Sequence, residues 1–414
     1  MLTISVLTIG DEICIGQIIN TNAAWIANEC TKIGCNVTIH STIGDDISII
    51  LREVERLITT SDVVLITGGL GPTHDDLTKD ALCEYFNDTL VHHQPTFDYL
   101  SSIYARRGQT VSERNATQAL LPSKATILNN LRGTAPGMWF EQNGKIVVSM
   151  PGVPREMKGI MENHVLPALS ELTAKTKGVQ VFKTLLTTGI TEANLADLIG
   201  EPNTFMNDAT LAFLPSYQGV RLRIGVLRAE KQDALAELTR IESHIRSRAN
   251  NFIFGENEQT LTSVVAGLLL EKKCTVSVAE SCTGGMLGAA LTELAGSSAY
   301  FEGGVQVYSY SAKEKILGVR HSTLLEFGAV SQETVEEMAN KVREKFGTDY
   351  GISISGIAGP EGGLPDKPVG TVWIGLADRY SVHSQKFVFS NDRTINRERS
   401  VSTALEMLYR ALLL

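Results

Sequence analysis

A serine, a tyrosine and a lysine lie close together in the last third of the chain, at Ser298, Tyr308 and Lys313. A serine hydroxyl attacks an amide carbon when a base takes its proton, and a lysine serves as that base when burial or a nearby cation lowers its pKa. A tyrosine between them can relay the proton or donate it to the leaving group. These three residue types are compatible with an amidohydrolase site. All three are common on surfaces and in turns, so without a surrounding pattern ordinary surface residues are the favoured interpretation.

Two glycine-rich loops occur in the same third, at 279–285 and 355–363, each at the end of a predicted strand. Backbone amides at such turns can hold a phosphate or an oxyanion. Arginines near the start of the last helix can reach a phosphate or simply form a solvated helix face. Cys282 is a second candidate nucleophile. The predicted substrate-binding residues are Ser281, Cys282, Thr283, Gly284, Gly285, Ser355, Gly356, Ile357, Ala358, Gly359, Arg393 and Arg399.

Acidic and glycine-rich turns follow three predicted strands near the amino terminus, at 10–12, 44–46 and 67–78. Carboxylates beside an anion-binding loop suit a divalent cation that bridges them to a phosphate. The alternative is that they are turn formers and helix caps. The predicted site comprises Asp11, Glu12, Asn20, Asn22, Asp45, Gly68, Gly69, Asp75, Asp76 and Lys79. The metal-ligand candidates are Asp11, Asp45 and Asp76.

The elements that position these acidic turns alternate in type. Residues 3–9 and 63–67 form apolar runs typical of buried strands, and 36–43 is a further predicted strand. Residues 22–33 and 47–60 show helical periodicity. A β-α-β-α-β order predicts a parallel sheet covered by helices. Loops at the carboxyl ends of parallel strands converge on one crevice, so the three turns are expected to form one site.

The rest of the chain predicts two further domains. A small α+β segment follows to about residue 250. The stretch 249–259 has the polar composition of a linker, with a short strand at 252–254 as the alternative. A second α/β unit begins near 260. Its predicted helices are 261–272, one from the first glycine-rich turn to about 295, 332–346 and one from about 394. Its predicted strands are 274–279, 304–308, 350–355, 370–377 and 384–389.

Composition excludes several classes of protein. The chain has 414 residues, a net charge of −9 and a pI near 5.5, which disfavours general binding to nucleic acid or to a membrane surface. Six cysteines without a Cys-x-x-Cys pair argue against a zinc ribbon or a redox dithiol and suit reduced thiols in the cytoplasm. No signal peptide or membrane-spanning segment is expected.

The amino-terminal motifs GDEICIGQIINTN, TGGLGPTHDDLT, RNATQALLP, GTAPG and MPGVPREM resemble those of the CinA family of competence/damage-inducible proteins. The resemblance covers residues 1–168. It implies a fold like that of molybdopterin-binding proteins and a metal-dependent ADP-ribose pyrophosphatase activity, with Mg²⁺, Mn²⁺ or Co²⁺ and with K⁺ as a further ion. A metal there would neutralise phosphate charge and activate a water. On this hypothesis Asp76→Ala should abolish hydrolysis.

Residues 169–255 correspond to the small domain of this family that is similar to a KH module. A KH domain that binds nucleic acid uses a Gly-x-x-Gly loop to clamp the backbone, and the sequence has none between its helical segments. Arg221, Arg223 and Arg228 alternate with apolar residues and are interpreted as an exposed strand face. A structural or dimerisation role is therefore favoured over nucleic-acid binding, and the family implies a homodimer.

The carboxy-terminal motifs AESCTGG, GSSAYFEGG, VYSYSAK, GAVS, SGIAGPEGG and KPVGTV resemble the carboxy-terminal CinA domain, which also occurs alone as a nicotinamide mononucleotide deamidase. The resemblance covers 256–414. It implies that Ser298 is the nucleophile, Tyr308 the proton relay and Lys313 the base, and that this domain needs no cofactor. One position departs from the pattern, since Tyr310 stands where the family usually has asparagine.

The resulting hypothesis is a bifunctional enzyme of pyridine-nucleotide salvage and NAD metabolism. Two three-layer α/β domains are joined by a small KH-like α+β domain. One alternative is a nucleotide or molybdopterin-binding module without turnover. Another is an interaction protein that acts in DNA uptake or the damage response.

Overall fold

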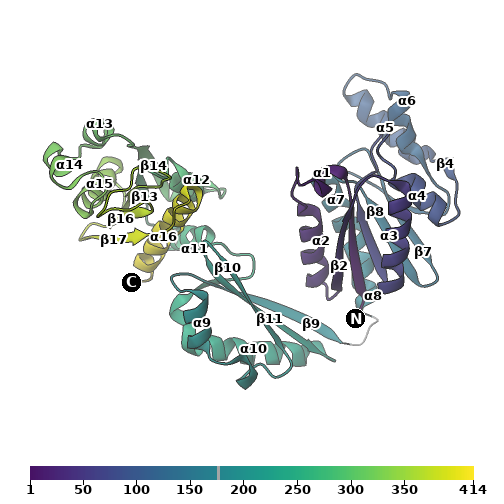
Figure 1. Ribbon diagram of the computed structural model, residues 1–414, viewed down its shortest axis with the longest axis horizontal. Coiled ribbons are helices and arrows are strands. Elements are labelled where there is room, and N and C mark those ends of the chain that lie inside the picture. The colour runs from purple at the N-terminus through teal and green to yellow at the C-terminus, as the bar shows by residue number, and fades with distance from the viewer. Residues whose placement is uncertain (175–177) are drawn as a thin grey trace. The chain divides into compact units, whose positions relative to one another are not determined.

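The computed structural model describes residues 1–174 and 178–414. Its contacts divide the chain into two compact units. The first consists of residues 1–181 with 227–234, and the second of 182–226 with 235–414. Figure 1 shows the helices and strands of both along the chain.

A mixed sheet forms the centre of the first unit, in the order β2-β1-β3-β8-β7-β6. The first four strands in this order run parallel, and β7 and β6 add an antiparallel edge. The carboxyl ends of β1, β2 and β3 therefore lie at one edge, as the sequence predicts. The strands are β1 (Thr3–Ile9), β2 (Asn36–Ile43), β3 (Val63–Thr67), β6 (Thr126–Leu128), β7 (Gly137–Gln142) and β8 (Lys145–Met150), with a separate pair β4 (Leu90–His92) and β5 (Leu120–Pro122).

Helices cover both faces of this sheet and give it three layers (Figure 1). Ile26 and Met157 belong to the core on one face, and Val54 and Leu82 to the core on the other. The predicted helix 47–60 begins where Asp46 accepts a hydrogen bond from the amide of Ile49. The helices are α1 (Asp11–Cys14), α2 (Thr21–Lys32), α3 (Ile47–Thr60), α4 (Thr78–Tyr85), α5 (Gln94–Arg106), α6 (Glu113–Ala116), α7 (Pro154–Ile160) and α8 (Leu166–Ala174).

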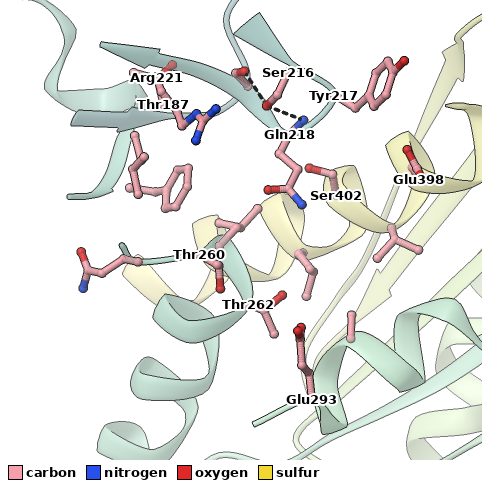
Figure 2. Close-up of a pocket in the computed structure, with 18 of the residues that line it drawn as sticks. Thr187, Ser216, Tyr217, Gln218, Arg221, Thr260, Thr262, Glu293, Glu398 and Ser402 are labelled. Carbon is pink, nitrogen blue, oxygen red and sulfur yellow. Dashed lines mark hydrogen bonds between the residues drawn. The ribbon is translucent and has the colours of Figure 1, made fainter. Parts of the chain in front are cut away.

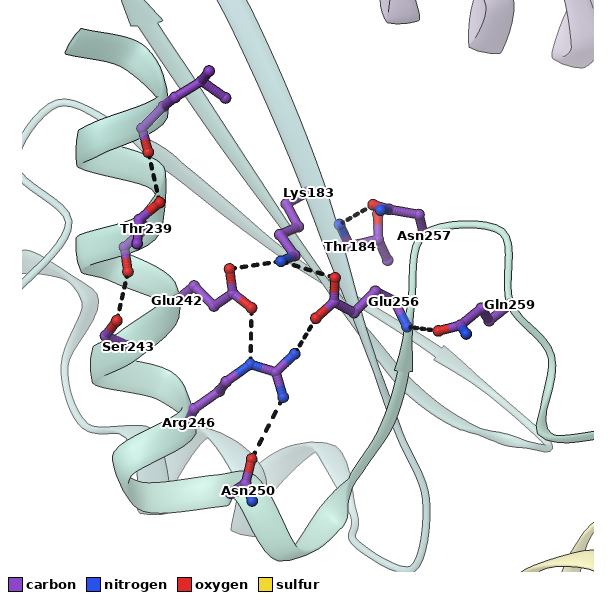
Figure 3. Close-up of polar contacts among 11 residues, drawn as sticks. Lys183, Thr184, Thr239, Glu242, Ser243, Arg246, Asn250, Glu256, Asn257 and Gln259 are labelled. Atoms are coloured by element: carbon purple, nitrogen blue, oxygen red, sulfur yellow. Dashed lines mark hydrogen bonds and ion pairs between the residues drawn. The ribbon is translucent and has the colours of Figure 1, made fainter. Parts of the chain in front are cut away.

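A four-stranded sheet follows, in the order β10-β11-β9-β12. The interpretation of 249–259 as a linker is wrong in part, because Ile253 to Glu256 form β12 and pair with β9. Ion pairs also hold β12 in place. Lys183 of β9 lies 2.7 Å from Glu242 and 2.8 Å from Glu256, and Arg246 bonds the same two carboxylates (Figure 3). The elements are β9 (Val179–Thr187), α9 (Glu192–Ile199), β10 (Thr210–Ser216), β11 (Gly219–Arg228), α10 (Lys231–Ala249) and β12 (Ile253–Glu256).

The last part of the chain builds a five-stranded sheet in the order β14-β13-β15-β16-β17. Helices α11, α12 and α16 cover one face, with Leu287 and Leu408 in its core. Helices α14 and α15 cover the other, with Leu324 and Met338. The elements are α11 (Leu261–Lys272), β13 (Val276–Glu280), α12 (Met286–Thr292), β14 (Phe301–Gln306), α13 (Tyr310–Ala312), α14 (His321–Phe327), α15 (Gln332–Phe346), β15 (Tyr350–Gly356), β16 (Thr371–Ala377), β17 (Val382–Val388) and α16 (Arg393–Leu413).

The strand predicted at 304–308 lies earlier, at Phe301–Gln306, because its pairing with β13 begins at Phe301. Val307 and Tyr308 leave the sheet, which frees their carbonyls for other partners. None of the helices in the described ranges combines the length and apolar character needed to span a bilayer. All six cysteines are free thiols.

Candidate functional site

Lys313 is the most unusual residue of the carboxy-terminal domain, because its side chain is completely buried. It follows the short helix α13, whose first turn is capped by Ser309. Its Nζ lies 2.7 Å from the carbonyl oxygen of Val307, 3.1 Å from that of Tyr308 and 3.1 Å from Oγ of Ser281. The fold therefore places a buried amine directly against a serine hydroxyl.

Burial lowers the pKa of Lys313 from 10.5 to about 8, against an opposing effect of the Cys282 thiol. A neutral amine keeps two N–H groups and one lone pair. Two of its three neighbours are carbonyl oxygens, which only accept hydrogen bonds. In the neutral form those carbonyls can take both N–H groups, which leaves the lone pair for the Ser281 hydroxyl; in the charged form Nζ donates to Ser281 Oγ. This geometry suits a general base acting on a serine.

The loop that carries Ser281 is held by a buried carboxylate that the sequence analysis did not single out. Glu280 is fully buried, and its two oxygens accept the amides of Gly285, Leu287 and Gly288 at 3.0, 3.1 and 2.8 Å. The expectation that amides at this helix start bind a phosphate or oxyanion is therefore wrong for these three. The amides of Cys282 and Thr283, which the carboxylate does not engage, remain candidates for the oxyanion.

Cys282 is buried, and desolvation raises the pKa of its thiol to about 11. A thiol with this pKa is protonated near neutral pH and is a poor nucleophile. Thr283 is also buried, and its Oγ1 makes no hydrogen bond within the described residues. Gly284 lies exposed in the left-handed region, with φ of 62°. Of the side chains in this loop, only Ser281 contacts the buried amine.

The first turns of α16 join the two glycine-rich loops. Arg397 donates to the carbonyl of Thr283 at 2.9 Å, and Arg393 donates to that of Gly359 at 3.0 Å. Between them the fully buried Asn396, which sequence reasoning missed, donates to the carbonyl of Ala358 at 2.9 Å. The two loops are thus brought to one place, as predicted.

The remaining predicted residues of the second loop have structural partners. Ser355 donates to the carbonyl of Ala329 at 2.6 Å, and the amide of Ile357 donates to that of Thr371 at 2.8 Å. Gly356 ends strand β15. Arg399 is partly exposed on α16, two residues beyond Arg397.

Ser298 and Tyr308 are both exposed, and the Tyr308 side chain is 66% accessible. Lys313 contacts the Tyr308 backbone rather than its phenol. Tyr310 does not contact Lys313 either. Its hydroxyl accepts the amide of Ala329 at 3.1 Å, so it braces the segment to which Ser355 is bonded.

A cavity of about 420 Å³ lies at the carboxyl ends of β1 and β3 in the amino-terminal domain. Seven of the ten predicted residues line it: Glu12, Asn22, Asp45, Gly68, Gly69, Asp75 and Asp76. Gly68 has a φ of 111°, and a Cβ there would meet the carbonyl oxygen of Ile9 at 2.0 Å. Only glycine fits this turn, which brings the β3 loop against the end of β1.

The predicted metal ligands do not surround one point. Among the residues that the structure describes, no three His, Cys, Asp or Glu side chains are grouped to hold a metal. Asp76 instead accepts the amides of Gly71 at 2.7 Å and Thr73 at 2.8 Å, as well as the Thr73 hydroxyl. Asp11 and Asp45 bond each other's backbone amides. A divalent ion would need oxygen ligands from a substrate phosphate and water, the usual pattern for Mg²⁺.

Desolvation raises the pKa of Asp45, and the hydrogen bond from the Asp11 amide opposes this effect. Repulsion from the carboxylates of Asp11, Glu12 and Asp75 raises the pKa further. A cation would relieve this repulsion, so the donor set fits a divalent metal when phosphate oxygens complete it.

Two other predicted residues serve the fold. Asn20 caps α2 by accepting the amide of Ala23, and Lys79 donates to the carbonyl of Thr117 at 2.8 Å.

Two buried amide side chains of this cavity have acceptor oxygens without a hydrogen-bond donor in the described residues. Asn22 donates to the carbonyl of Gly152 at 2.7 Å, which fixes its orientation, yet its Oδ1 has no partner among the described residues. Oε1 of Gln118 is likewise buried and unpartnered. Gln118 and Glu156, which also line the cavity, were not among the predicted site residues. Gln118 lies in no glycine-rich turn and no periodicity marks it, whereas Glu156 belongs to the MPGVPREM motif.

Comparison with known proteins covers the whole chain. Three family models match in succession, described as a probable molybdopterin-binding domain (5–171), a damage-inducible protein CinA KH domain (182–255) and a CinA C-terminal domain (258–412). A CinA-like protein of Salinibacter ruber is 42% identical over 408 residues, 98% of each chain. A putative competence-damage inducible protein of Clostridium acetobutylicum is 36% identical over the full length of both.

The chain belongs to the CinA family. Among solved structures, a CinA superfamily protein of Klebsiella pneumoniae is 38% identical, with a TM-score of 0.36 over 37% of this chain and 96% of its own. The predicted family and fold class are confirmed. The CinA family name by itself specifies no reaction, so the chemistry must be argued from the two sites.

Proposed function

We propose that the carboxy-terminal domain is a serine-lysine amidohydrolase that deamidates nicotinamide mononucleotide to nicotinate mononucleotide and ammonia. The contact between the buried amine of Lys313 and the Ser281 hydroxyl supports this most strongly. The substrate follows from the resemblance of the loop motifs to the deamidase, and the chemistry follows from the base.

In the first half-reaction, Ser281 Oγ bonds to the carboxamide carbon while its proton moves to Lys313 Nζ. The tetrahedral intermediate then expels the amide nitrogen, which takes that proton and leaves as ammonia. An ester on the serine remains. In the second half-reaction a water attacks this ester, Lys313 accepts the proton, and return of the proton to the serine releases the carboxylate. The amides of Cys282 and Thr283 are placed to stabilise the oxyanion.

The choice of nucleophile differs here from the one that the family resemblance implies. Ser298 stays a prediction, and the geometry favours Ser281 because Ser281 is the hydroxyl in contact with the base. If Ser298 attacks, Ser281 must pass its proton on, and both serines are then required.

The two assignments are separated by trapping the acyl-enzyme. Full-length protein is mixed with nicotinamide mononucleotide, quenched in acid and digested, and the mass shift is located by peptide mass spectrometry. We expect the nicotinoyl nucleotide on Ser281, and we expect ammonia release to vanish in Lys313→Ala and Ser281→Ala. An adduct on Ser298 would make Ser281 the relay. An adduct on Cys282, or turnover by Lys313→Ala, would overturn the serine-lysine mechanism.

We propose a second activity, metal-dependent hydrolysis of ADP-ribose, for the amino-terminal cavity. Its specific support is the combination of repelling carboxylates with two unpartnered amide oxygens, on Asn22 and Gln118, that hydroxyl groups of a sugar can satisfy. Asp45 and Asp75 would hold the metal together with phosphate oxygens and water. The metal would neutralise the phosphate charge and supply an activated water.

The test compares Asp45→Asn with Asp46→Asn in an assay of AMP release from ADP-ribose with added Mg²⁺, Mn²⁺ or Co²⁺. Asp46 lies next in sequence but caps α3, and asparagine is an equally good cap. We expect Asp45→Asn and chelation with EDTA each to abolish turnover, whereas Asp46→Asn retains it. Tight ADP-ribose binding without turnover under every metal would favour the alternative of a binding module.

We also propose a cytoplasmic homodimer. Six free thiols suit a reducing compartment, and the dimer rests on the family resemblance alone. Light scattering on the full chain tests the dimer.

A further inference from the structure

A cavity in the second unit contains none of the residues assigned to the two candidate sites. Its volume is about 670 Å³, within the range of small-molecule sites. The β10–β11 turn and strands β9 and β12 form one side, and helices α11, α12 and α16 form the other (Figure 2). No predicted substrate-binding residue lines it, although Met286 of its lining directly follows Gly285 of the Ser281 loop.

Several polar groups of this cavity have no partner. Arg221 of β11 is exposed and makes no ion pair or hydrogen bond within residues 1–174 and 178–414. Thr262 and Ser402 are each 9% exposed and line the cavity, and their hydroxyls form no hydrogen bond in that part of the chain. An occupant that offers hydrogen-bonding groups would satisfy both.

The start of α11 adds donors at the same place. Thr260 caps this 12-residue helix by accepting the amide of Ser263, and the amides of Leu261 and Thr262 precede the first bonds inside the helix. With Arg221 across the cavity, these amides and the Thr262 hydroxyl form a site for an anion, a phosphate above all.

The rest of the lining specifies what the phosphate is attached to. Glu293, which follows α12, and Glu398 of α16 bring two carboxylates, which accept hydrogen bonds from hydroxyl groups and suit a ribose. Phe254, Met286 and Leu405 supply an apolar surface for a planar ring. Figure 2 shows Arg221 and Glu398 on opposite sides, with Gln218 and Ser402 between them.

We propose that this cavity binds a nucleoside monophosphate, with the phosphate at Arg221 and the helix start, the ribose at the carboxylates and the base on the apolar surface. Free phosphate would leave the carboxylates and the apolar surface unused, and an apolar ligand would leave Arg221 unpaired. The proposal does not depend on either proposed activity.

The test uses the full-length chain and AMP, which has no carboxamide for the deamidase to hydrolyse. An azido-adenosine monophosphate photoprobe is crosslinked, and labelled peptides are mapped by mass spectrometry with and without competing AMP. Mapping separates this cavity from the amino-terminal one, which can also hold a nucleotide. We expect competed label in peptides that contain Phe254, Met286 or Leu405.

Matched variants give the control. Arg221→Ala should weaken AMP competition in these peptides about 10- to 100-fold, the usual effect of losing a charge-assisted bond to phosphate. Arg223→Ala should leave it unchanged, because Arg223 lies on the same strand but stacks on Phe182. Ala290→Phe fills the cavity and should abolish labelling, whereas the exposed Ala289→Phe should not.

Circular dichroism confirms that each variant is folded. Absence of label from these peptides in the wild-type chain, or equal labelling of Ala290→Phe and Ala289→Phe, would overturn the proposal.

Discussion

Replacing Lys313 with methionine should change how the stability of the protein depends on pH. The folded protein holds this lysine with a pKa of about 8, and an unfolded chain holds it near 10.5. Between these values the unfolded state binds one more proton than the folded state. Stability of the wild type therefore rises with pH by about 1.4 kcal/mol per unit in this window. Below pH 8 the cost of burying the charge is present in full.

The total gain over the window is about 3 kcal/mol for this single group. Methionine has a similar length and no charge, so the Lys313→Met variant lacks this gain. Its loss of the bonds to Val307 and Tyr308 adds a constant that does not vary with pH. The wild type should thus gain about 3 kcal/mol on the variant between pH 7 and pH 10.5, and other titrating groups cancel in the difference.

Urea unfolding measures this difference when fluorescence reports only the carboxy-terminal domain. Trp373 lies on β16 of that domain, so Trp25 and Trp139 are first replaced by phenylalanine in both proteins. The same pKa should appear in the rate, because a general base acts when deprotonated. We expect kcat/KM for nicotinamide mononucleotide to rise with pH to a plateau above about 8. If the difference in unfolding free energy between the wild type and Lys313→Met does not change with pH, the lowered pKa of the buried lysine is refuted, even if the variant is inactive.

Three further substitutions test other parts of the structure. Glu280→Gln should destabilise the carboxy-terminal domain by about 2–4 kcal/mol in urea unfolding, because an amide nitrogen then faces backbone N–H groups; unchanged stability would contradict the assigned bonds. Gly68→Ala should lower the free energy of unfolding by several kcal/mol, because its Cβ would meet a backbone oxygen. Gly144→Ala is the control: its φ is 74° but the space around it is open, so it should lower the free energy of unfolding by about 1 kcal/mol. Tyr310→Phe should cost about 1 kcal/mol through the lost bond to Ala329 and leave kcat within a few-fold; loss of turnover would give Tyr310 a direct role.

The sequence predicts much of the fold because the strands and helices that build it carry unambiguous periodicity. The helix predicted at 261–272 and the one at 332–346 have those bounds in the structure. Short elements such as β10 and β12 were missed or assigned to a linker, since their pairing with distant strands, and not their own pattern, makes them strands. Propensity alone does not determine such segments.

The site shows the same limit. Lys313 could be chosen from the sequence, but its partner could not, because which serine reaches it depends on how β13 and α13 meet. Ser281 and Ser298 are both serines in glycine-containing turns, and no spacing rule separates them. Glu280 was missed because a glutamate at the end of a strand is usually exposed, and here a helix start covers it.

Glu280 and Asp76 have one consequence for both domains. Each lies in a glycine-rich motif of the kind that is normally interpreted as a phosphate site. In each motif the carboxylate itself accepts the hydrogen bonds of the loop amides. An internal anion that is part of the chain holds the loop rigid without a ligand. It also repels a phosphate from the amides that it occupies. The phosphate of a substrate must therefore bind elsewhere, and near Ser281 the guanidinium groups of Arg393 and Arg397 are suitable, since each uses one nitrogen on a loop carbonyl and keeps other donors.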